Sequence, residues 1–244
     1  MSPISIVKEI AESIQPDVIS LDFMRFPTTW EIIPPGTPRD GIRNFCFCDR
    51  CLTSFQQQSG VTVPTDLPAR DRKAAWILAH HDAEWVTWKT SVITSFVGEA
   101  SRAVRQAAPD MKVNIHVLPW SEATFQNAIV WNGGQDVAAL APFVDYLSPM
   151  IYHKLIGQPA EYVGTLTAEL ARKTHKAILP SIQAAKILGE REIPADEFRQ
   201  TLSLALQAPS EGTLIYHWPE LRVDGGASAL RREKNAIFRA AASR

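Results

Sequence analysis

Strand-like segments recur along the second half of this chain at nearly constant intervals. Four segments rich in β-branched and aromatic residues lie at 111–118, 144–152, 177–183 and 212–218. They begin 33, 33 and 35 residues apart, which is the length of one strand plus one crossover helix. Helix-compatible segments fill the gaps at 159–174 and 195–207, and another follows at 227–242. Repeated strand–helix units of this kind predict a parallel sheet covered by helices.

The first half of the chain adds one more strand and an interruption. Ser2 and Pro3 open a helix, and a short buried strand follows at 17–23. A long helix is predicted over 82–107, and Pro109 ends it. The Pro-rich segment 27–80 is predicted to be a loop excursion over one end of the sheet.

Five strand–helix units are countable, whereas a closed barrel of the (β/α)8 TIM type has eight. We therefore predict an α/β fold of this type that is partial, built as a single domain over residues 1–244. An incomplete barrel leaves two unpaired sheet edges, so self-association is expected.

Composition and charge exclude several classes of protein. With 25 Lys+Arg against 26 Asp+Glu and 45% hydrophobic residues, the chain matches an ordinary globular protein. The balance of charges gives no footprint for nucleic acid, and no apolar run reaches the ~18 residues that span a bilayer. The N-terminus shows no secretion signal, so a cytoplasmic location is the default expectation, with a secreted full-length parent left open.

Polar residues stand where the strands are predicted to end. In such barrels the active site lies at the carboxyl ends of the strands, and alternate residues face the interior. This reasoning selects Asp22, His116, Tyr152, Gln183 and His217. Together they predict a polar crown suited to a sugar, although each alone could be a satisfied core residue or point outward.

Several motifs resemble glycoside hydrolase-like TIM barrels of uncharacterised families. They lie in Leu21–Pro27, Cys46–Phe55, Gly134–Asp136 and Val144–His153. The resemblance implies that the strand ending at Asp22 is the fourth of eight, so that the first three would be absent. It also implies a carbohydrate substrate, without identifying the sugar.

Glycosidases usually need two carboxyl groups, one as acid and one as nucleophile or base. Of the carboxylates, only Asp22 is well placed to be one of the two. Glu122, shortly after the strand at 111–118, is predicted as its catalytic partner, with Glu31 and Glu220 on other loops as alternatives.

Other residues are predicted to hold the sugar. An indole face can stack on a pyranose ring, which favours the two tryptophans that directly follow strands. Arg25 either holds Asp22 ionised or serves as a structural ion-pair partner, because strand alternation places it on the opposite face. The predicted substrate-binding residues are Arg25, His116, Trp120, Tyr152, His153, Gln183, His217 and Trp218.

All three cysteines lie at Cys46, Cys48 and Cys51. This spacing suits three corners of a structural zinc site, with a fourth ligand such as His80, His81 or Asp49. Three reduced cysteines that stiffen the loop without metal are the alternative. No cofactor is expected for catalysis.

The sequence therefore predicts a glycoside hydrolase. The main alternative is a non-catalytic or degenerate carbohydrate-binding barrel fragment, which would keep the crown but need no acid–base pair. Metal-dependent hydrolysis is a third reading, and it lacks a closely spaced set of ligands.

Overall fold

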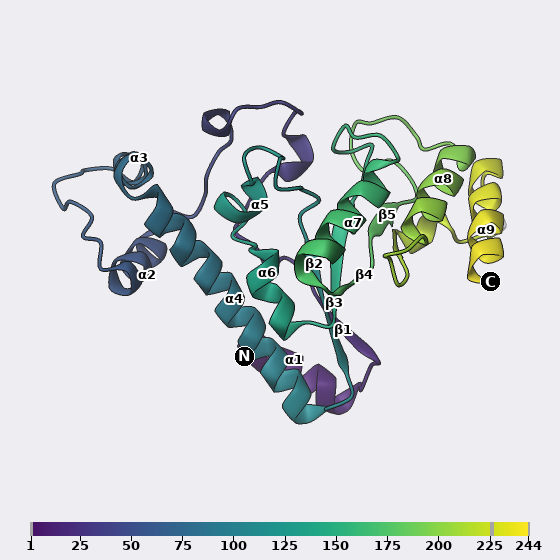
Figure 1. Ribbon diagram of the computed structural model, residues 1–244, viewed down its shortest axis with the longest axis horizontal. Coiled ribbons are helices and arrows are strands. Elements are labelled where there is room, and N and C mark those ends of the chain that lie inside the picture. Colours follow the sequence, from purple (N-terminus) through teal and green to yellow (C-terminus); the bar gives the residue numbers. More distant parts are fainter. Residues whose placement is uncertain (1, 225–226, 244) are drawn as a thin grey trace.

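The computed structural model describes residues 2–224 and 227–243 (Figure 1). Its α-helices are α1 Pro3–Ser13, α2 Asp49–Ser59, α3 Arg70–His80, α4 Asp82–Ala107, α5 Ala128–Trp131, α6 Val137–Leu140, α7 Tyr162–Thr174, α8 Ala195–Ala205 and α9 Ala229–Ala242. Its strands are β1 Val18–Leu21, β2 Lys112–Val117, β3 Tyr146–Ile151, β4 Ala177–Ile178, β5 Ser181–Gln183 and β6 Leu214–Tyr216. The short 3-10 helices are η1 Trp30–Ile32, η2 Arg39–Gly41, η3 Ala141–Phe143 and η4 Trp218–Glu220.

The strands form one parallel sheet in the order β1-β2-β3-β5-β6. The short strand β4 also pairs with β3, next to Tyr146 and Leu147, while β5 pairs farther along at Met150 and Ile151. Since both lie on the same side of β3, they are two parts of one strand position. The sheet thus has five positions and forms half of a barrel, which confirms the predicted fold class.

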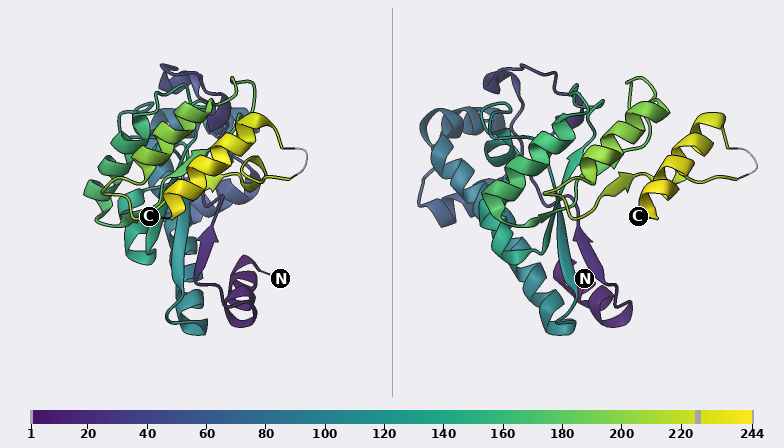
Figure 2. Two further views of the ribbon diagram at one scale, coloured as in Figure 1. Left: turned by 90° about the vertical axis from the view of Figure 1, so that its right-hand side faces the viewer. Right: turned by 45° about the vertical axis from the view of Figure 1, so that its right-hand side comes forward.

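Helices cover the outer face of this half-barrel (Figure 2). Val113, Ile115 and Val117 of β2 point outward and are fully buried in the same core cluster as Val97 and Val104 of α4. Alternate residues of β2 point to one face of the sheet, and residues at helical spacing form one apolar face of α4. These two apolar faces pack together. The predicted helix 82–107 is confirmed at both ends, and Ser2 caps α1 by accepting a hydrogen bond from the backbone N–H of Ser5.

The segment 27–80 differs from the predicted loop excursion, because it contains α2 and α3. These helices pack with the N-terminal half of α4 around a second hydrophobic cluster. In it, Phe47 stacks on Trp85 with ring centroids 4.6 Å apart, and Phe55 meets Trp88 edge to face. The prolines and glycines that suggest a loop lie between these helices, where Gly60 ends α2 with a φ of 74°. The helices α2 and α3 therefore cover Trp85 and Trp88 of α4.

Both outer strands of the described sheet, β1 and β6, have one unpaired edge. Apolar side chains are exposed near each edge, with Ile14 and Val18 beside β1 and Tyr216 and Trp218 at β6. We therefore expect the purified chain to self-associate, and light scattering coupled to size-exclusion chromatography measures this. A monomer that unfolds cooperatively and binds no hydrophobic dye would contradict the expectation.

None of the described helices is long and apolar enough to cross a bilayer.

Candidate active site

Small polar side chains line the inner face of the half-barrel, where larger aliphatic residues usually fill a barrel interior. Asn114 on β2 donates its Nδ2 to Ser20 Oγ at 2.6 Å, and Ser148 Oγ on β3 donates to Asn114 Oδ1 at 2.8 Å. The register pairs Ser20 with Asn114, so the next inward-facing residues along these two strands are Asp22 and His116. The serine and asparagine side chains form the floor beneath them.

Asp22 and His116 face each other at the carboxyl ends of β1 and β2. Asp22 is exposed, and its Oδ1 accepts a hydrogen bond from the backbone N–H of Phe23 at 2.7 Å. Burial lowers the pKa of His116, although the charge of Asp22 acts in the opposite direction, and the net shift favours the neutral ring. Its Nδ1 is buried and has no hydrogen-bond partner within the described residues. A ligand would therefore have to meet the ring at its other nitrogen, Nε2.

Arg25 lies on the same side as Asp22, which differs from the opposite face that alternation predicts. The reason is a reversal at Phe23, whose φ is 57°, followed by a hydrogen bond from the Arg25 N–H to the Phe23 carbonyl. The Arg25 guanidinium lies 4.6 Å from the centroid of the Phe23 ring. Burial lowers the pKa of Arg25, and the charges of Glu31 and then Asp22 oppose this shift. Arg25 is therefore close enough to both carboxylates to feel their charge.

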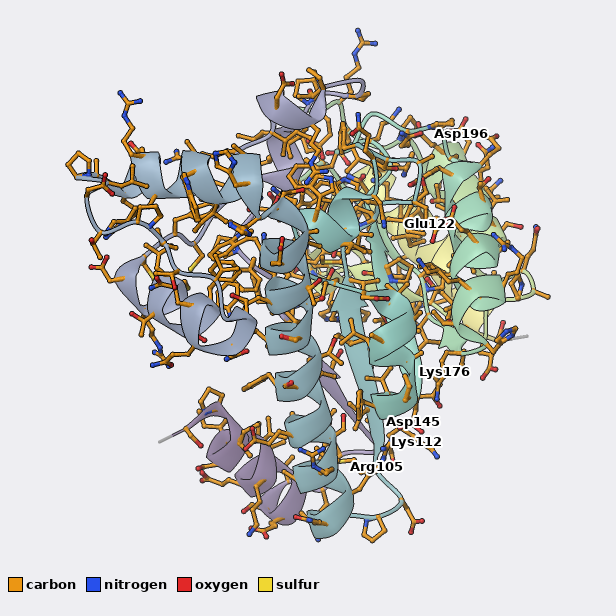
Figure 3. All side chains as sticks on the ribbon, turned by 60° about the vertical axis from the view of Figure 1, so that its left-hand side comes forward. Arg105, Lys112, Glu122, Asp145, Lys176 and Asp196 are labelled. Carbon is orange, nitrogen blue, oxygen red and sulfur yellow. The ribbon has the colours of Figure 1, made fainter. Side chains whose placement is uncertain are left out.

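The structure does not bring Glu122 to Asp22. After Trp120 the chain turns outward to Glu122, which is labelled in Figure 3. Glu122 pairs with Lys173 of α7, and its backbone N–H donates to Glu169. Its side chain is 59% exposed, so it belongs to the outer surface of α7. The alternative Glu220 forms an ion pair with Arg231 of α9.

The remaining alternative, Glu31, follows Trp30 within η1. Its charge counteracts the burial-induced lowering of the Arg25 pKa more strongly than the charge of Asp22 does. Among the three glutamates considered from sequence, Glu31 is thus the one whose charge acts on Arg25 together with that of Asp22.

Tyr152 stands between two aromatic rings at the centre of the crown. Its ring centroid lies 6.0 Å from that of Trp30 and 5.2 Å from that of Tyr216, and its hydroxyl is 3.5 Å from Ser181 Oγ. Burial raises the pKa of Tyr152 to about 12, so the phenol keeps its proton and can donate it in a hydrogen bond. Tyr216 was not selected from sequence, because alternation along the last strand pointed to its neighbours.

The predicted residues after β6 and β2 have different surroundings. His217 and Trp218 are exposed, and the His217 ring lies 4.8 Å from Tyr216, so they extend the crown along its rim. Trp120 is only 3% exposed and meets Phe125 edge to face. It is therefore part of a packed wall and offers no open indole face.

His153 and Gln183 have structural partners in place of an open site. The Nε2 of His153 lies 2.6 Å from Glu197 of α8, which also pairs with Lys154. Gln183 accepts the N–H of Lys154 and donates to the carbonyl of Ala185. Both side chains are buried and tie the loops after β3 and β5, so the structure does not support their prediction as sugar-binding residues.

Gln135, a fully buried residue, holds the ends of β1 and β2 together. Its Oε1 accepts the N–H of Leu118, and its Nε2 donates to the carbonyls of Met24 and His116. Gly133, two residues before it, has little space for a side chain, because a Cβ there would lie 2.6 Å from Leu118 Cδ1. Sequence reasoning missed this role, although two consecutive glycines are a signal of close backbone approach.

Replacing Gln135 with alanine is expected to destabilise the protein by about 2–4 kcal/mol, because it leaves buried backbone groups without partners. Denaturant-induced unfolding measures the change. The matched control is Gln57→Ala on the exposed face of α2, which should shift stability by less than about 0.5 kcal/mol. Equal stability of both variants would show that Gln135 does not hold the strand ends.

The three cysteines form a cluster at the start of α2. Their sulfur atoms all lie within 4.8 Å of one another, and the Sγ atoms of Cys46 and Cys51 are 3.0 Å apart. The backbone N–H of Cys51 lowers the pKa of Cys48, whereas burial raises that of Cys51. In a tetrahedral zinc site with Zn–S bonds of about 2.3 Å, sulfur atoms are about 3.8 Å apart, so the cluster fits three corners. Within the described residues, neither a histidine nor a carboxylate completes the group.

We propose that this cluster holds a structural zinc ion, at most one per chain. Elemental analysis of protein purified without chelators tests it, and less than about a tenth of an equivalent would contradict it. Cys46→Ser should then release the metal and make the segment 27–80 more sensitive to limited proteolysis. Thr53→Ala, at an exposed position of the same helix α2, is the control and should change neither.

No family model and no curated protein matches this sequence. Solved structures that resemble it are carbohydrate-active TIM barrels of low sequence identity. The glycoside hydrolase domain of PgaB (BpsB) from Bordetella bronchiseptica superposes with a TM-score of 0.57 at 15% identity, over 89% of this chain and 59% of that one. The catalytic domain of β-amylase from Paenibacillus polymyxa gives a TM-score of 0.58 at 12% identity, over 98% and 67%.

A third similar structure is the β-galactosidase from the psychrophilic Marinomonas ef1, with a TM-score of 0.54 at 8% identity, over 81% of this chain. The chain spans 59% of the first of these structures and 37% of the third. With its five parallel strand positions, the chain therefore has the fold of the TIM-barrel glycoside hydrolases, as a half-barrel.

Proposed function

We propose that this chain hydrolyses glycosidic bonds and that Asp22 is a catalytic carboxylate. The observation that carries the proposal is the exposed Asp22 at the carboxyl end of β1, on the inner face of the sheet, beside His116 and a half-buried Arg25. Active sites of TIM barrels lie at this end of the sheet. The likeness in fold to glycoside hydrolases supports the reaction class without identifying residues.

Asp22 and Glu31 are the proposed pair of carboxylates. In this scheme Asp22 stabilises the positive charge that develops on the sugar ring, and Glu31 protonates the leaving oxygen. The charges of both carboxylates oppose the lowering of the Arg25 pKa, so both lie within electrostatic reach of one cation. Changes at Arg25 should therefore affect both groups.

The other crown residues would bind and orient the sugar. Tyr152 has a protonated hydroxyl, and the half-buried His116 ring has its second nitrogen, Nε2, to offer, so both would form hydrogen bonds with sugar hydroxyls. Trp218, at the exposed rim, offers an indole face for stacking on a pyranose ring.

A non-catalytic carbohydrate-binding half-barrel is the second candidate. It is favoured by the absence, within the described residues, of any ion pair or side-chain hydrogen bond that joins Asp22 to another charged group. Such a protein would keep the crown and bind sugars without cleaving them.

Hydrolysis of a panel of 4-nitrophenyl glycosides and of unmodified polysaccharides tests the proposal. We expect release of nitrophenol or of reducing ends by the wild-type protein. Binding without release would select the carbohydrate-binding alternative. The absence of both binding and release across the panel would refute a carbohydrate role for the crown.

A further inference from the structure

A second cleft, of about 480 Å³, adjoins the crown. It opens between the segments 30–38, 119–126 and 156–162, and we call it the aromatic cleft. Among its lining residues are Trp30, Trp120, Phe125, Gln126, Gln158 and Tyr162. Its volume lies within the range of about 300–1,000 Å³ that small-ligand sites occupy.

The walls of the aromatic cleft are fixed by packing and hydrogen bonds. Trp120 and Phe125 meet edge to face with ring centroids 5.6 Å apart. The hydroxyl of Tyr162 donates to the carbonyl of Pro119 and accepts the N–H of Ser121. A ligand would therefore bind with little ordering of the protein, which favours affinity.

The chemistry of the lining selects a neutral, amphipathic ligand. None of the described residues that line the aromatic cleft has a charged side chain. Aromatic rings alternate there with amides and hydroxyls, and the side-chain amides of Gln126 and Gln158 make no hydrogen bond within the described part of the chain. The half-buried rings of Phe125 and Tyr162 can stack on C–H faces, and the amides can bind hydroxyls, so the lining suits a neutral pyranose.

Trp30 connects the aromatic cleft to the crown. It lines the cleft, and its ring lies 6.0 Å from that of Tyr152. It is 4% exposed, and its indole N–H has no hydrogen-bond partner within the described residues. Trp30 is therefore a wall that the crown and the aromatic cleft share.

We infer that the aromatic cleft is a second sugar subsite, so that the substrate is a neutral oligosaccharide or polysaccharide with sugar units on both sides of the wall that Trp30 forms. This inference rests on the proposed function, since it extends the site of Asp22. It predicts that affinity depends on chain length and that single-sugar glycosides are poor ligands. A neutral proline-rich peptide is the competing ligand for a cleft of this composition.

Calorimetric titration of the Asp22→Asn protein, which prevents turnover, tests the inference. The probes are maltohexaose, cellohexaose and chitohexaose, each compared with the methyl glycoside of its sugar. We expect at least one hexasaccharide to bind about tenfold more tightly than its methyl glycoside and to shift the tryptophan fluorescence. Gln158→Ala should weaken hexasaccharide binding about fivefold more than glycoside binding, whereas Gln57→Ala on α2 should weaken neither.

The outcomes separate this inference from the proposed function. Equal affinity for a hexasaccharide and its methyl glycoside would overturn the second subsite and leave the crown as a sugar site. Binding of a proline decamer, lost in Gln158→Ala, would replace the sugar with a peptide in the aromatic cleft. Failure to bind any saccharide would overturn both.

Discussion

Replacing Asp22 with asparagine is expected to lower glycosidase activity by about a thousandfold or more, while the protein remains folded. Asparagine keeps the size of the side chain and removes the charge that stabilises the transition state. The Phe23 N–H that donates to Oδ1 can still donate to the amide oxygen, so the turn after β1 should persist. Initial rates on the most reactive glycoside of the panel measure the effect, and circular dichroism with thermal melting confirms the fold.

The control for this variant is Asp17→Asn, which removes an exposed carboxylate just before β1. We expect its activity to remain within about twofold of the wild type. Full turnover by Asp22→Asn would exclude a catalytic role for Asp22, and an equal loss in both variants would point to a nonspecific effect of charge.

The repeating units of the fold could be predicted from sequence because their signals are local. Apolar residues at helical spacing and Pro109 delimit α4, and runs of β-branched residues mark β2 and β3. The helices within 27–80 were missed because their stability depends on distant partners. Phe55 is fully buried, and Trp85, thirty residues later, packs against it together with Trp88.

The crown was predicted where strand alternation holds. It placed Asp22, His116 and Tyr152 together, since each stands at or just beyond a strand end on the inner face. It failed for Arg25, where the positive φ of Phe23 reverses the chain. A left-handed phenylalanine has no signal in a single sequence, because that conformation is rare for residues other than glycine.

Predictions also failed where a long-range partner decides the role of a side chain. Nothing near His153 in sequence indicates that Glu197, on α8, will bind it. The same holds for Glu122, which pairs with Lys173 across the surface of α7. Polar residues close to strand ends are therefore ambiguous until the packing of the outer helices is known.

Glu31→Gln is the second variant with a large expected effect. If Glu31 protonates the leaving oxygen, the variant should lose about a hundredfold or more of its rate on substrates with poor leaving groups. The loss should be much smaller on a dinitrophenyl glycoside, whose leaving group needs no proton. The dependence of rate on the leaving group thus distinguishes an acid from a residue that only binds the sugar.

Glu122→Gln and Glu220→Gln are the matched controls, because the structure pairs these glutamates with Lys173 and Arg231 away from Arg25. Each should stay within about twofold of the wild type on every substrate. A Glu31→Gln protein with unchanged rates would remove the only described glutamate whose charge reaches Arg25 together with that of Asp22. Asp22 would then lack a partner within the described residues, and the carbohydrate-binding alternative would be the better account of the crown.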